Sequence, residues 1–415
     1  MKKKLLIIVG AGASLDFGMP SVSDIDNLFE SWASHHLPLA DNESKNIYTW
    51  VKDKAETHFS KQSKNGQYKA PNFEQTLFTI QNIASISESN YWGGHNPLNA
   101  FIDFKSFPEI LFYRNKKIAD GMDFQNLHGY LIDELLRYFR KQCLELQTKK
   151  SAELTSLRLF FENLKEDFEL GFINLNYDNV ILSALPDLST GFNHQTGEFD
   201  TSEFYNSKWN FCYHLHGSVH FDTRDINEID DHPIFWQQDL KSKFHPGAGQ
   251  RNINQTSNGI KHLNSNIITG LDKPNQLLKV PFKQYFGKLD KLAYEADSFL
   301  FIGYGFGDIH LNKVFPIHRF DPKKIRKVAV IDWASDDTDG FWDRADDWGD
   351  GLATTVRCNA VLGNGVEGIL PPKVGHYKET KTLEFSPNRE LPLSIWYNGL
   401  MEACKNGTLI KNALK

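Results

Sequence analysis

The sequence predicts an α/β fold built on a Rossmann-like parallel sheet, and three observations lead to this prediction. Apolar runs without alternation, such as LLIIV at 5–9 and SFLFI at 298–302, are typical of strands covered on both faces. Each of these runs ends in glycines or polar residues. Amphipathic helical stretches separate the runs, and strands that alternate with helices indicate βαβ units in a doubly wound sheet.

The composition is that of a globular protein with no general attraction to nucleic acid. The 415 residues are 40% hydrophobic and the formal net charge is -6, so we predict no direct contact with nucleic acid. The run LLIIV is too short for a signal peptide, and no stretch reaches the ~20 apolar residues of a membrane span. The spacing of the cysteines argues against a zinc module and a disulfide framework, and it favours a cytoplasmic location. The four are Cys143, Cys212, Cys358 and Cys404.

The first half of the chain begins with a strand and continues with helices. The strand at 5–9 is followed by the glycine turn GAGAS, which we expect to open a helix. From 37 to 166 the pattern is helical, and we interpret this range as a large helical insertion. Within it, apolar residues recur every four positions, which predicts a helix over 123–146 with Asp123 as its N-cap. The apolar stripe of this helix comprises Leu127, Leu131, Leu135, Phe139 and Cys143.

The second half of the chain supplies the remaining strands. We predict them at 168–175, in WNFCYHLHG up to His216 and Gly217, at 298–302, and in IRKVAVIDW up to Asp332. A helix with an apolar stripe precedes the strand at 298–302, whereas 222–275 is polar and shows no periodicity. The stripe comprises Tyr285, Phe286, Leu289, Leu292, Ala293 and Ala296. We therefore divide the chain into a sheet domain of 1–36 and 167–335, the insertion 37–166, and a C-terminal extension 336–415.

Glycines and polar residues stand where the predicted strands end. In a doubly wound sheet these ends meet at one edge, where ligands bind. GAGAS suits a phosphate there, although Leu15 replaces the third glycine of G-x-G-x-x-G, and a tight turn without a ligand also explains it. A lone histidine is more often structural, and Asn or Asp after a strand is more often a turn or a cap. Their combination at one edge favours a functional site. The strand ends are Gly10–Ser14, Asn176–Asp178, His216–Ser218, Gly303–Gly305 and Asp332.

Four of these motifs, in their order along the chain, resemble the sirtuin superfamily. They are VGAGASLDFGMP, NLNYDN, HLHGS and FIGYGFGD. In detail they are most similar to the sirtuin-like NADase domains of bacterial antiphage defence proteins. The resemblance covers residues 4–25 and 168–335 and excludes the insertion and the C-terminal extension. It implies a sheet of the sirtuin type and NAD+ as the substrate.

The resemblance also implies roles for the residues at the strand ends. Asn176 and His216 would carry the reaction, and Asp178 would hold the carboxamide or the water. Asp332 would contact a hydroxyl of the adenosine ribose. The residues expected around the nucleotide are Gly10, Ala11, Gly12, Ala13 and Ser14 at the pyrophosphate, Met19 and Pro20 near the nicotinamide ribose, and Gly303, Tyr304 and Gly305.

The departures from deacylating sirtuins favour cleavage of NAD+ by water. The cysteines lack the spacing of the sirtuin zinc module, and GMP is followed by Ser21, Val22 and Ser23 instead of a Phe-Arg pair. We find no segment for an acyl-lysine channel, so a protein deacylase is the poorer interpretation. Nicotinamide leaves as a neutral molecule, so the site has to stabilise an oxocarbenium-like ribose and needs no general acid. We expect no metal.

The regulation and the partners of such an enzyme follow from the resemblance alone. We expect an NAD+ glycohydrolase that depletes NAD+ in antiphage defence and is controlled by a HerA-type hexameric DNA-translocating ATPase or an Argonaute-like protein. A homo-oligomer is expected on another ground, because the amphipathic helix over 123–146 could bury its stripe on another subunit as well as internally. A non-catalytic sensor of NAD or ADP-ribose and an assembly module for a partner ATPase are the alternatives. The sequence does not choose between hydrolysis and cyclisation, and it identifies neither the trigger nor a role for 222–275 and 336–415.

Overall fold

The computed structural model contains one seven-stranded sheet with the strand order β12-β13-β11-β10-β1-β4-β5. Six strands are parallel, and β12 is antiparallel at the edge. The strands are β1 (Lys3–Val9), β4 (Phe168–Asn174), β5 (Phe211–His214), β10 (Ser298–Ile302), β11 (Lys327–Ile331), β12 (Glu384–Phe385) and β13 (Leu393–Trp396). Counted from the β5 edge, the parallel strands are β5, β4, β1, β10, β11 and β13. If these six strands are numbered along the chain, their order in the sheet is 3-2-1-4-5-6. This is the doubly wound Rossmann order, so the predicted fold class is confirmed.

The structure describes most of the chain, and all structural statements refer to these parts. They are residues 2–37, 46–62, 71–87, 96–112, 115–206, 208–223, 234–243, 253–255, 261–263, 265–271, 273–277, 279–315, 325–341, 344, 346–356, 372–386 and 392–415. Cys358 and much of 222–275 lie outside them.

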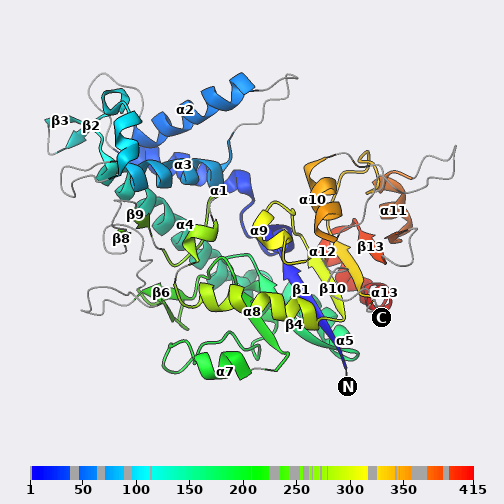
Figure 1. Cartoon of the computed structure of the whole chain (residues 1–415). Coiled ribbons are helices and arrows are strands. Elements are labelled where there is room, and N and C mark those ends of the chain that lie inside the picture. Colours follow the sequence, from blue (N-terminus) through cyan, green and yellow to red (C-terminus); the bar gives the residue numbers. More distant parts are fainter. Residues whose placement is uncertain are drawn as a thin grey trace.

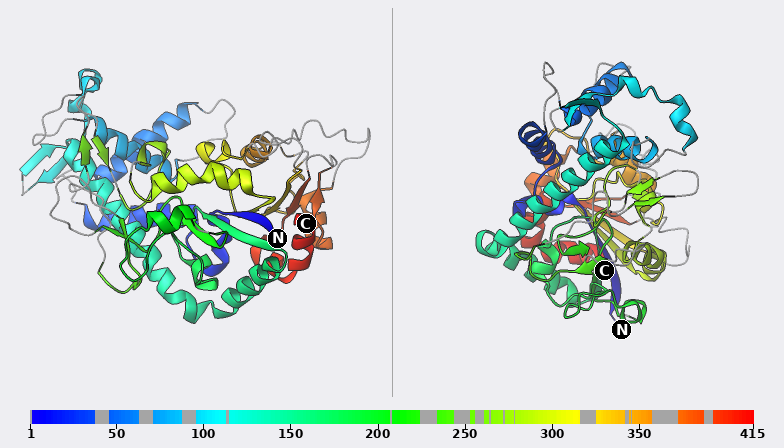
Figure 2. Two further views of the ribbon diagram at one scale, coloured as in Figure 1. Left: turned by 60° about the horizontal axis from the view of Figure 1, so that its bottom comes forward. Right: turned by 90° about the vertical axis from the view of Figure 1, so that its left-hand side faces the viewer.

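Both faces of the sheet are buried, which explains the apolar runs without alternation. In β1, Leu5 and Ile7 belong to one core cluster, while Leu6 and Ile8 belong to the other. Helices α5 (Ser151–Lys165), α12 (Gly399–Lys405) and α13 (Gly407–Leu414) cover the first face, and α8 (Phe282–Glu295) covers the second (Figures 1 and 2). Each fully buried aliphatic side chain contributes about 1.5–3 kcal/mol, so burial on both faces stabilises these strands.

The sheet extends beyond residue 335, the expected end of the sheet domain. Strand β13 pairs with β11, and β12 pairs with β13, so the range 336–415 completes one edge. The Ser298 hydroxyl donates to the carbonyl of Leu414 over 2.8 Å, and Lys3 Nζ donates to the carbonyl of Lys415 over 2.6 Å. The two ends of the chain consequently lie close together (Figure 2).

The helical insertion contains α2 (Ile47–Gln62), α3 (Phe73–Ile86), the hairpin β2 (Glu109–Phe112) and β3 (Asn115–Ile118), and α4 (Gly121–Lys149). Of these, α2, α3 and the hairpin lie at the opposite end of the molecule from α12 and α13 (Figure 1). Helix α1 (Val22–His36) packs on α3 and α4. Helix α5 also comes from 37–166, but it packs against β4, so the sequence boundary at 166 does not separate it from the sheet.

The predicted stripe of α4 is buried, but the helix begins earlier than expected. All five stripe residues are at most 6% exposed. The N-cap is Asp120, whose side chain accepts from the backbone N–H of Met122 and Asp123. Asp123 is the third helical residue, and its carboxylate accepts from the Asp120 N–H over 2.8 Å. The two acids form a capping box, in which both positions favour an acid, and this explains why Asp123 was a wrong prediction for the cap.

The remaining described elements are short. They are the 3-10 turns η1 (Ala11–Ala13), η2 (Leu15–Phe17), η3 (Pro97–Phe101), η4 (Phe104–Ser106) and η5 (Lys273–Gln276), the helices α6 (Val180–Ala184), α7 (Thr201–Asn206), α9 (Ile309–Asn312), α10 (Asp347–Val356) and α11 (Val374–Thr380), and the strands β6 (Phe221–Thr223), β7 (Ile234–Trp236), β8 (Ile253–Gln255) and β9 (Lys261–Leu263). Among the described helices, none has both the length and the apolar character that crossing a membrane requires.

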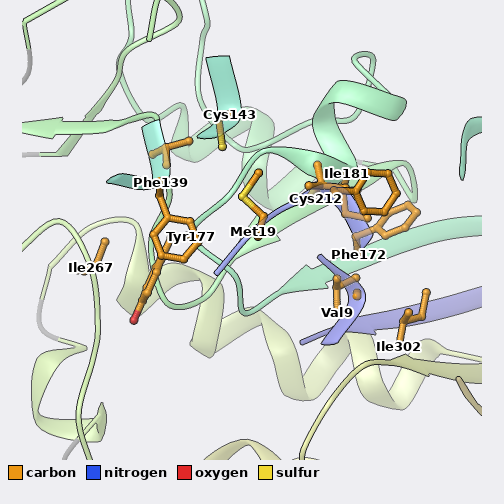
Figure 3. Packing of buried hydrophobic residues seen from close by; sticks show 14 of the residues in the cluster. Val9, Met19, Phe139, Cys143, Phe172, Tyr177, Ile181, Cys212, Ile267 and Ile302 are labelled. Carbon is orange, nitrogen blue, oxygen red and sulfur yellow. The ribbon is translucent and has the colours of Figure 1, made fainter. Parts of the chain in front are cut away.

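Helix α4 fixes the loops that surround the exits of β4 and β5. Its Arg140 is buried and donates to the carbonyls of Val219, Leu240 and Ser242 over 2.8, 3.0 and 3.1 Å. The residue before it, Phe139, packs edge-on against Tyr177, with 5.6 Å between the ring centroids (Figure 3). The insertion is therefore attached to the part of the sheet where the candidate site lies.

One buried histidine of α4 predicts a loss of stability in acid. Burial lowers the pKa of His128 to about 4, whereas an unfolded histidine has a pKa of about 6.5. Between these values the unfolded chain binds a proton that the folded chain excludes, so the free energy of unfolding falls as the pH drops through this window. Urea denaturation at pH 7.5 and at pH 5 measures how far the free energy of unfolding falls between these two pH values. For His128→Gln this fall should be about 1–2 kcal/mol smaller than for the wild type.

The control for this prediction is the exposed His376. His376→Gln should lose as much stability on acidification as the wild type. Equal losses in His128→Gln and the wild type would show that His128 takes up its proton in the folded state as readily as in the unfolded chain.

Candidate functional site

The glycine turn after β1 does not open an α-helix, which corrects the sequence prediction. The chain passes through η1 and η2, and α1 begins only at Val22. Gly18 has a φ of +81° and ends η2, and Pro20 follows without a backbone N–H to donate. A capping box between Ser21 and Asp24 then starts α1. The argument that a helix N-terminus at Gly10–Ser14 favours phosphate therefore does not apply.

Three glycines of this region allow two loops to touch between β1 and β10. The Gly12 N–H donates to the carbonyl of Gly303 over 2.9 Å, and the Gly10 N–H donates to Ile302 over 2.9 Å. A β-carbon on Gly303, which has a φ of +56°, would lie 2.1 Å from the Ala13 nitrogen, and one on Gly10 would lie 2.6 Å from the Gly303 oxygen. Glycine at these positions is thus required by loop packing at the point where the strand order reverses.

This contact predicts a large difference between two neighbouring glycines. Gly303→Ala should lower the free energy of unfolding by about 2–4 kcal/mol, because the new β-carbon overlaps backbone atoms and the left-handed conformation is strained. Gly305→Ala is the matched control, since a β-carbon there has no atom within 4 Å, and its stability should change by no more than about 0.5 kcal/mol. Urea denaturation of both variants checks this, and similar midpoints would contradict it.

Asn176 connects the exit of β4 to the glycine turn. It is 8% exposed. Its Nδ2 donates to the Gly10 carbonyl and to the Ser14 hydroxyl, each over 2.9 Å, and its backbone N–H donates to Asn174 Oδ1 over 3.0 Å. An amide nitrogen has two hydrogens to donate, so both are used within the protein. The oxygen Oδ1 is the part of this side chain that a ligand hydroxyl or a water could contact.

Asp178 is turned into the protein and caps the next helix. It is 1% exposed, and its Oδ1 accepts from the N–H of Val180 over 3.0 Å, at the start of α6. Burial raises the pKa of Asp178. Hydrogen bonds from the Ser14 hydroxyl and the Val180 N–H lower it, but the effect of burial is larger. Asn179, the residue directly before α6, makes no side-chain capping bond. The capping role therefore belongs to Asp178.

His216 lies in the turn after β5, two residues beyond the end of the strand. It is 4% exposed, and its carbonyl accepts from the N–H of Ile268 over 2.8 Å. Its Nε2 is buried and has no hydrogen-bond partner among the described residues. Burial, followed by the charge of Lys273 and by His310, lowers the pKa of His216 to about 3, although Asp308 and the Leu175 backbone raise it. At neutral pH this imidazole is neutral and its Nε2 is left without a partner.

Four residues near His216 have no assigned role from the sequence. They are Glu74, Lys273, Asp308 and His310. Lys273 Nζ lies 2.6 Å from Asp308 Oδ1 and 3.2 Å from Glu74 Oε1. Asp308 belongs to the motif FIGYGFGD, whereas Lys273 lies in the range without periodicity and Glu74 in the insertion, where no motif marked it.

The other predicted residues are placed around the same edge of the sheet. Ala11, Gly12 and Gly305 are exposed, whereas Met19 and Pro20 are buried. Met19 belongs to the core cluster of Tyr177 and Cys212 (Figure 3).

Tyr304 is part of the core, and Asp332 lies one strand further along. Tyr304 is 4% exposed, and its hydroxyl donates to Asn312 Oδ1 over 2.7 Å. Asp332 follows β11 and is half-buried, and burial raises the pKa of its carboxyl to about 6. The structure thus brings Gly10, Ser14, Asn176 and Gly303 into one contact network, with His216 and Asp332 at the exits of other strands of the sheet.

The chain is similar to known proteins over part of its length. A family model described as "SIR2-like domain" matches residues 171–343, which is less than half of the chain. No curated protein matches the sequence.

Several solved structures resemble the chain at low identity. A Sir2 homologue mutant in complex with 2'-O-acetyl ADP ribose has 11% identity over 80% of this chain and 82% of its own, with a TM-score of 0.35. A complex of a Sir2 homologue with NAD has 10% identity over 86% and 89%, with a TM-score of 0.34. A structure described under the mechanism and regulation of Sir2 enzymes has 13% identity over 86% and 91%, with a TM-score of 0.33. These TM-scores are too low to support an inference about this chain.

The domain match includes the exits of β4, β5, β10 and β11, and with them the candidate residues Asn176, His216 and Asp332. Residues 171–343 are thus similar to a SIR2-like domain, and they contribute to four of the parallel strands of the sheet.

Proposed function

We propose that the protein is an NAD+ glycohydrolase that cleaves NAD+ into nicotinamide and ADP-ribose or its cyclic form. The SIR2-like match supports NAD+ as the substrate. The single observation that carries the proposal is the buried Nε2 of His216, which has no partner among the described residues and lies at the carboxyl edge of a Rossmann-ordered sheet. A buried polar atom without a partner is costly, and a hydroxyl of the substrate would satisfy it.

The residues around His216 fit the parts of NAD+ that the reaction uses. The Nε2 of His216 is an acceptor for a ribose hydroxyl or a water, and Asn176 Oδ1 is a second acceptor whose orientation is fixed by Gly10 and Ser14. The space beside Gly305 is open. Asp332, at the exit of β11, would accept from the adenosine ribose, as an acid at a strand end does in dinucleotide-binding sheets.

The chemistry of the bond suits a site without a general acid. The bond between C1′ of the ribose and the pyridinium nitrogen breaks, and its electron pair neutralises the ring, so nicotinamide leaves without protonation. A water oxygen then bonds to C1′ and loses a proton to His216 Nε2, which acts as the general base. In cyclisation a nitrogen of the adenine would take the place of water. Asn176 Oδ1 would orient the attacking water or the ribose.

The biological role that we propose is depletion of NAD+ in antiphage defence, in the cytoplasm and under the control of a partner. The resemblance of the four motifs supports this role, and the same resemblance supports a HerA-type ATPase or an Argonaute-like partner. Regulation is expected because continuous cleavage of NAD+ would kill the host cell.

The function is tested by incubating the full chain with NAD+ and separating the products by chromatography. We expect nicotinamide together with ADP-ribose or cyclic ADP-ribose, either from the chain alone or after a partner is added. Tight binding of NAD+ without nicotinamide release under all conditions would indicate a sensor and contradict the proposed enzyme. Release of nicotinamide only with an acylated peptide would indicate a deacylase.

A further inference from the structure

His216 shares its surroundings with two groups that the proposed reaction has not used so far. One nitrogen of His216, one oxygen of Asp308 and one nitrogen of His310 all lie within 4.8 Å of one another. Asp308 precedes α9, and His310 is its second residue, so both come from the loop that follows β10. The exits of β5 and β10, which belong to different halves of the sheet, thus supply one cluster.

Such a cluster could hold a metal ion, but the charge beside it disfavours a cation. The ammonium of Lys273 lies 2.6 Å from Asp308 Oδ1 and is itself buried. It already supplies the positive charge that balances this carboxylate. A divalent ion among the same three side chains would be repelled by a buried ammonium in a medium of low dielectric constant.

Lys273 also connects this cluster to the helical insertion. Its Nζ lies 3.2 Å from Glu74 Oε1, in the first turn of α3. The loop that carries Lys273 packs on the same helix, because a β-carbon on Gly270 would lie 3.4 Å from the Cα of Phe78. Two carboxylates therefore share one ammonium, and Asp308 is held in place from the side of the insertion.

We propose that Asp308 is a positioning residue for His216, which stabilises the imidazolium that forms when His216 accepts a proton. The proposal rests on the proposed function, since it assumes that His216 is the general base. Asp308 supplies the negative charge beside the ring, and Lys273 with Glu74 fixes its carboxylate.

The charges that face His216 explain why Asp308 is expected to have a large effect on the strength of His216 as a base. Lys273 on η5 and His310 on α9 both oppose a positive charge on the ring, and Asp308 favours one. Glu74 on α3 is one contact further away, behind Lys273. Without Asp308, the proton would be accepted near the ammonium of Lys273, and the remaining carboxylate partner of that ammonium, Glu74, lies one contact further from the ring. The base would then be weaker, and the rate would fall with the strength of the base.

The test is a double-mutant cycle in the full chain, with its partner if activity needs one. Asp308→Asn should lower kcat at least tenfold and change KM for NAD+ less than about threefold. In the His216→Ala background, Asp308→Asn should cause no further loss, because it acts through the histidine. Asp308→Glu, which keeps the charge, should recover part of the rate. Asp290→Asn, at an exposed position of α8, is the matched control and should leave kcat unchanged.

Three outcomes would overturn the proposal. An equal fold-loss in the wild-type and His216→Ala backgrounds would mean that Asp308 acts independently of His216. Full activity in Asp308→Asn would mean that it does not act at all. Loss of wild-type activity with EDTA and its recovery with Zn²⁺ would mean that the cluster is a metal site.

A measurement without turnover separates this proposal from the proposed function. In protein labelled at histidine, with His216→Asn to assign the signal, Lys273→Met should move the titration midpoint of His216 to higher pH. Adding Asp308→Asn to Lys273→Met should move it back to lower pH. If the chain never cleaves NAD+, the proposed function fails while this titration still decides on Asp308. An unchanged midpoint in the double variant would reject the role of Asp308, even in an active enzyme.

Discussion

His216→Ala should lower the rate of nicotinamide release from NAD+ by a factor of about 10²–10⁴, the usual contribution of a general base. The substitution removes a neutral imidazole whose Nε2 has no partner among the described residues, so few contacts of the fold are lost with it. Nicotinamide release by the purified variant, measured by chromatography under conditions where the wild type is active, checks this expectation.

Two controls make the result for His216 specific. His220 lies four residues further along and is also buried, but its Nδ1 bonds to the Gln237 carbonyl over 2.9 Å and its ring stacks on Trp236. His220→Ala should lower stability and leave the activity of the folded fraction within about threefold. Circular dichroism establishes that each variant is folded. A folded His216→Ala protein with wild-type turnover would remove this residue from the reaction.

Asn176→Ala should reduce kcat/KM for NAD+ by a factor of about 10² or more, and it should also lower the free energy of unfolding by about 1–2 kcal/mol. The first effect follows from the loss of an oriented acceptor next to the reacting ribose. The second follows because the Gly10 carbonyl and the Ser14 hydroxyl each lose a donor at 2.9 Å. Kinetics and urea denaturation of the same preparation measure the two effects separately.

Asn179→Ala is the matched control for Asn176. This side chain lies three residues away and makes no capping hydrogen bond to α6. Its removal should leave turnover unchanged and stability within about 0.5 kcal/mol. A stability loss in Asn176→Ala without any change in kcat/KM would show that Asn176 is structural, a clamp between a strand exit and a turn.

Five of the seven strands could be predicted from the sequence because they are marked locally, whereas β12 and β13 lie in 336–415 and were not predicted. An apolar run such as 5–9 is buried on both faces wherever it lies, and its length and the following glycine define one strand. The position of helix α1 was not predictable in the same way. The residues GAGAS are compatible with a helix, and only the left-handed Gly18 and Pro20 further along force two short turns first.

The candidate site could be predicted only in part, for a related reason. Asn176 and His216 follow strands, so the parallel sheet alone places them at one edge. Lys273 reaches Asp308 and Glu74 across 35 and 199 positions of the chain, and no local pattern records such a distance. The burial that leaves His216 neutral likewise results from packing of loops that the sequence left unassigned.

The position of β13 in the sheet also has a consequence for the synthesis of the protein. Strand β11 is covered on one side by β10 and on the other by β13, which is formed by residues 393–396. A ribosome releases the chain from its N-terminal end, so the side of β11 that β13 covers stays open until residues 393–396 have emerged. The N–H of Asp332 donates to the carbonyl of Trp396 over 2.9 Å, so the backbone of this candidate residue is held in place only after that segment has been synthesised.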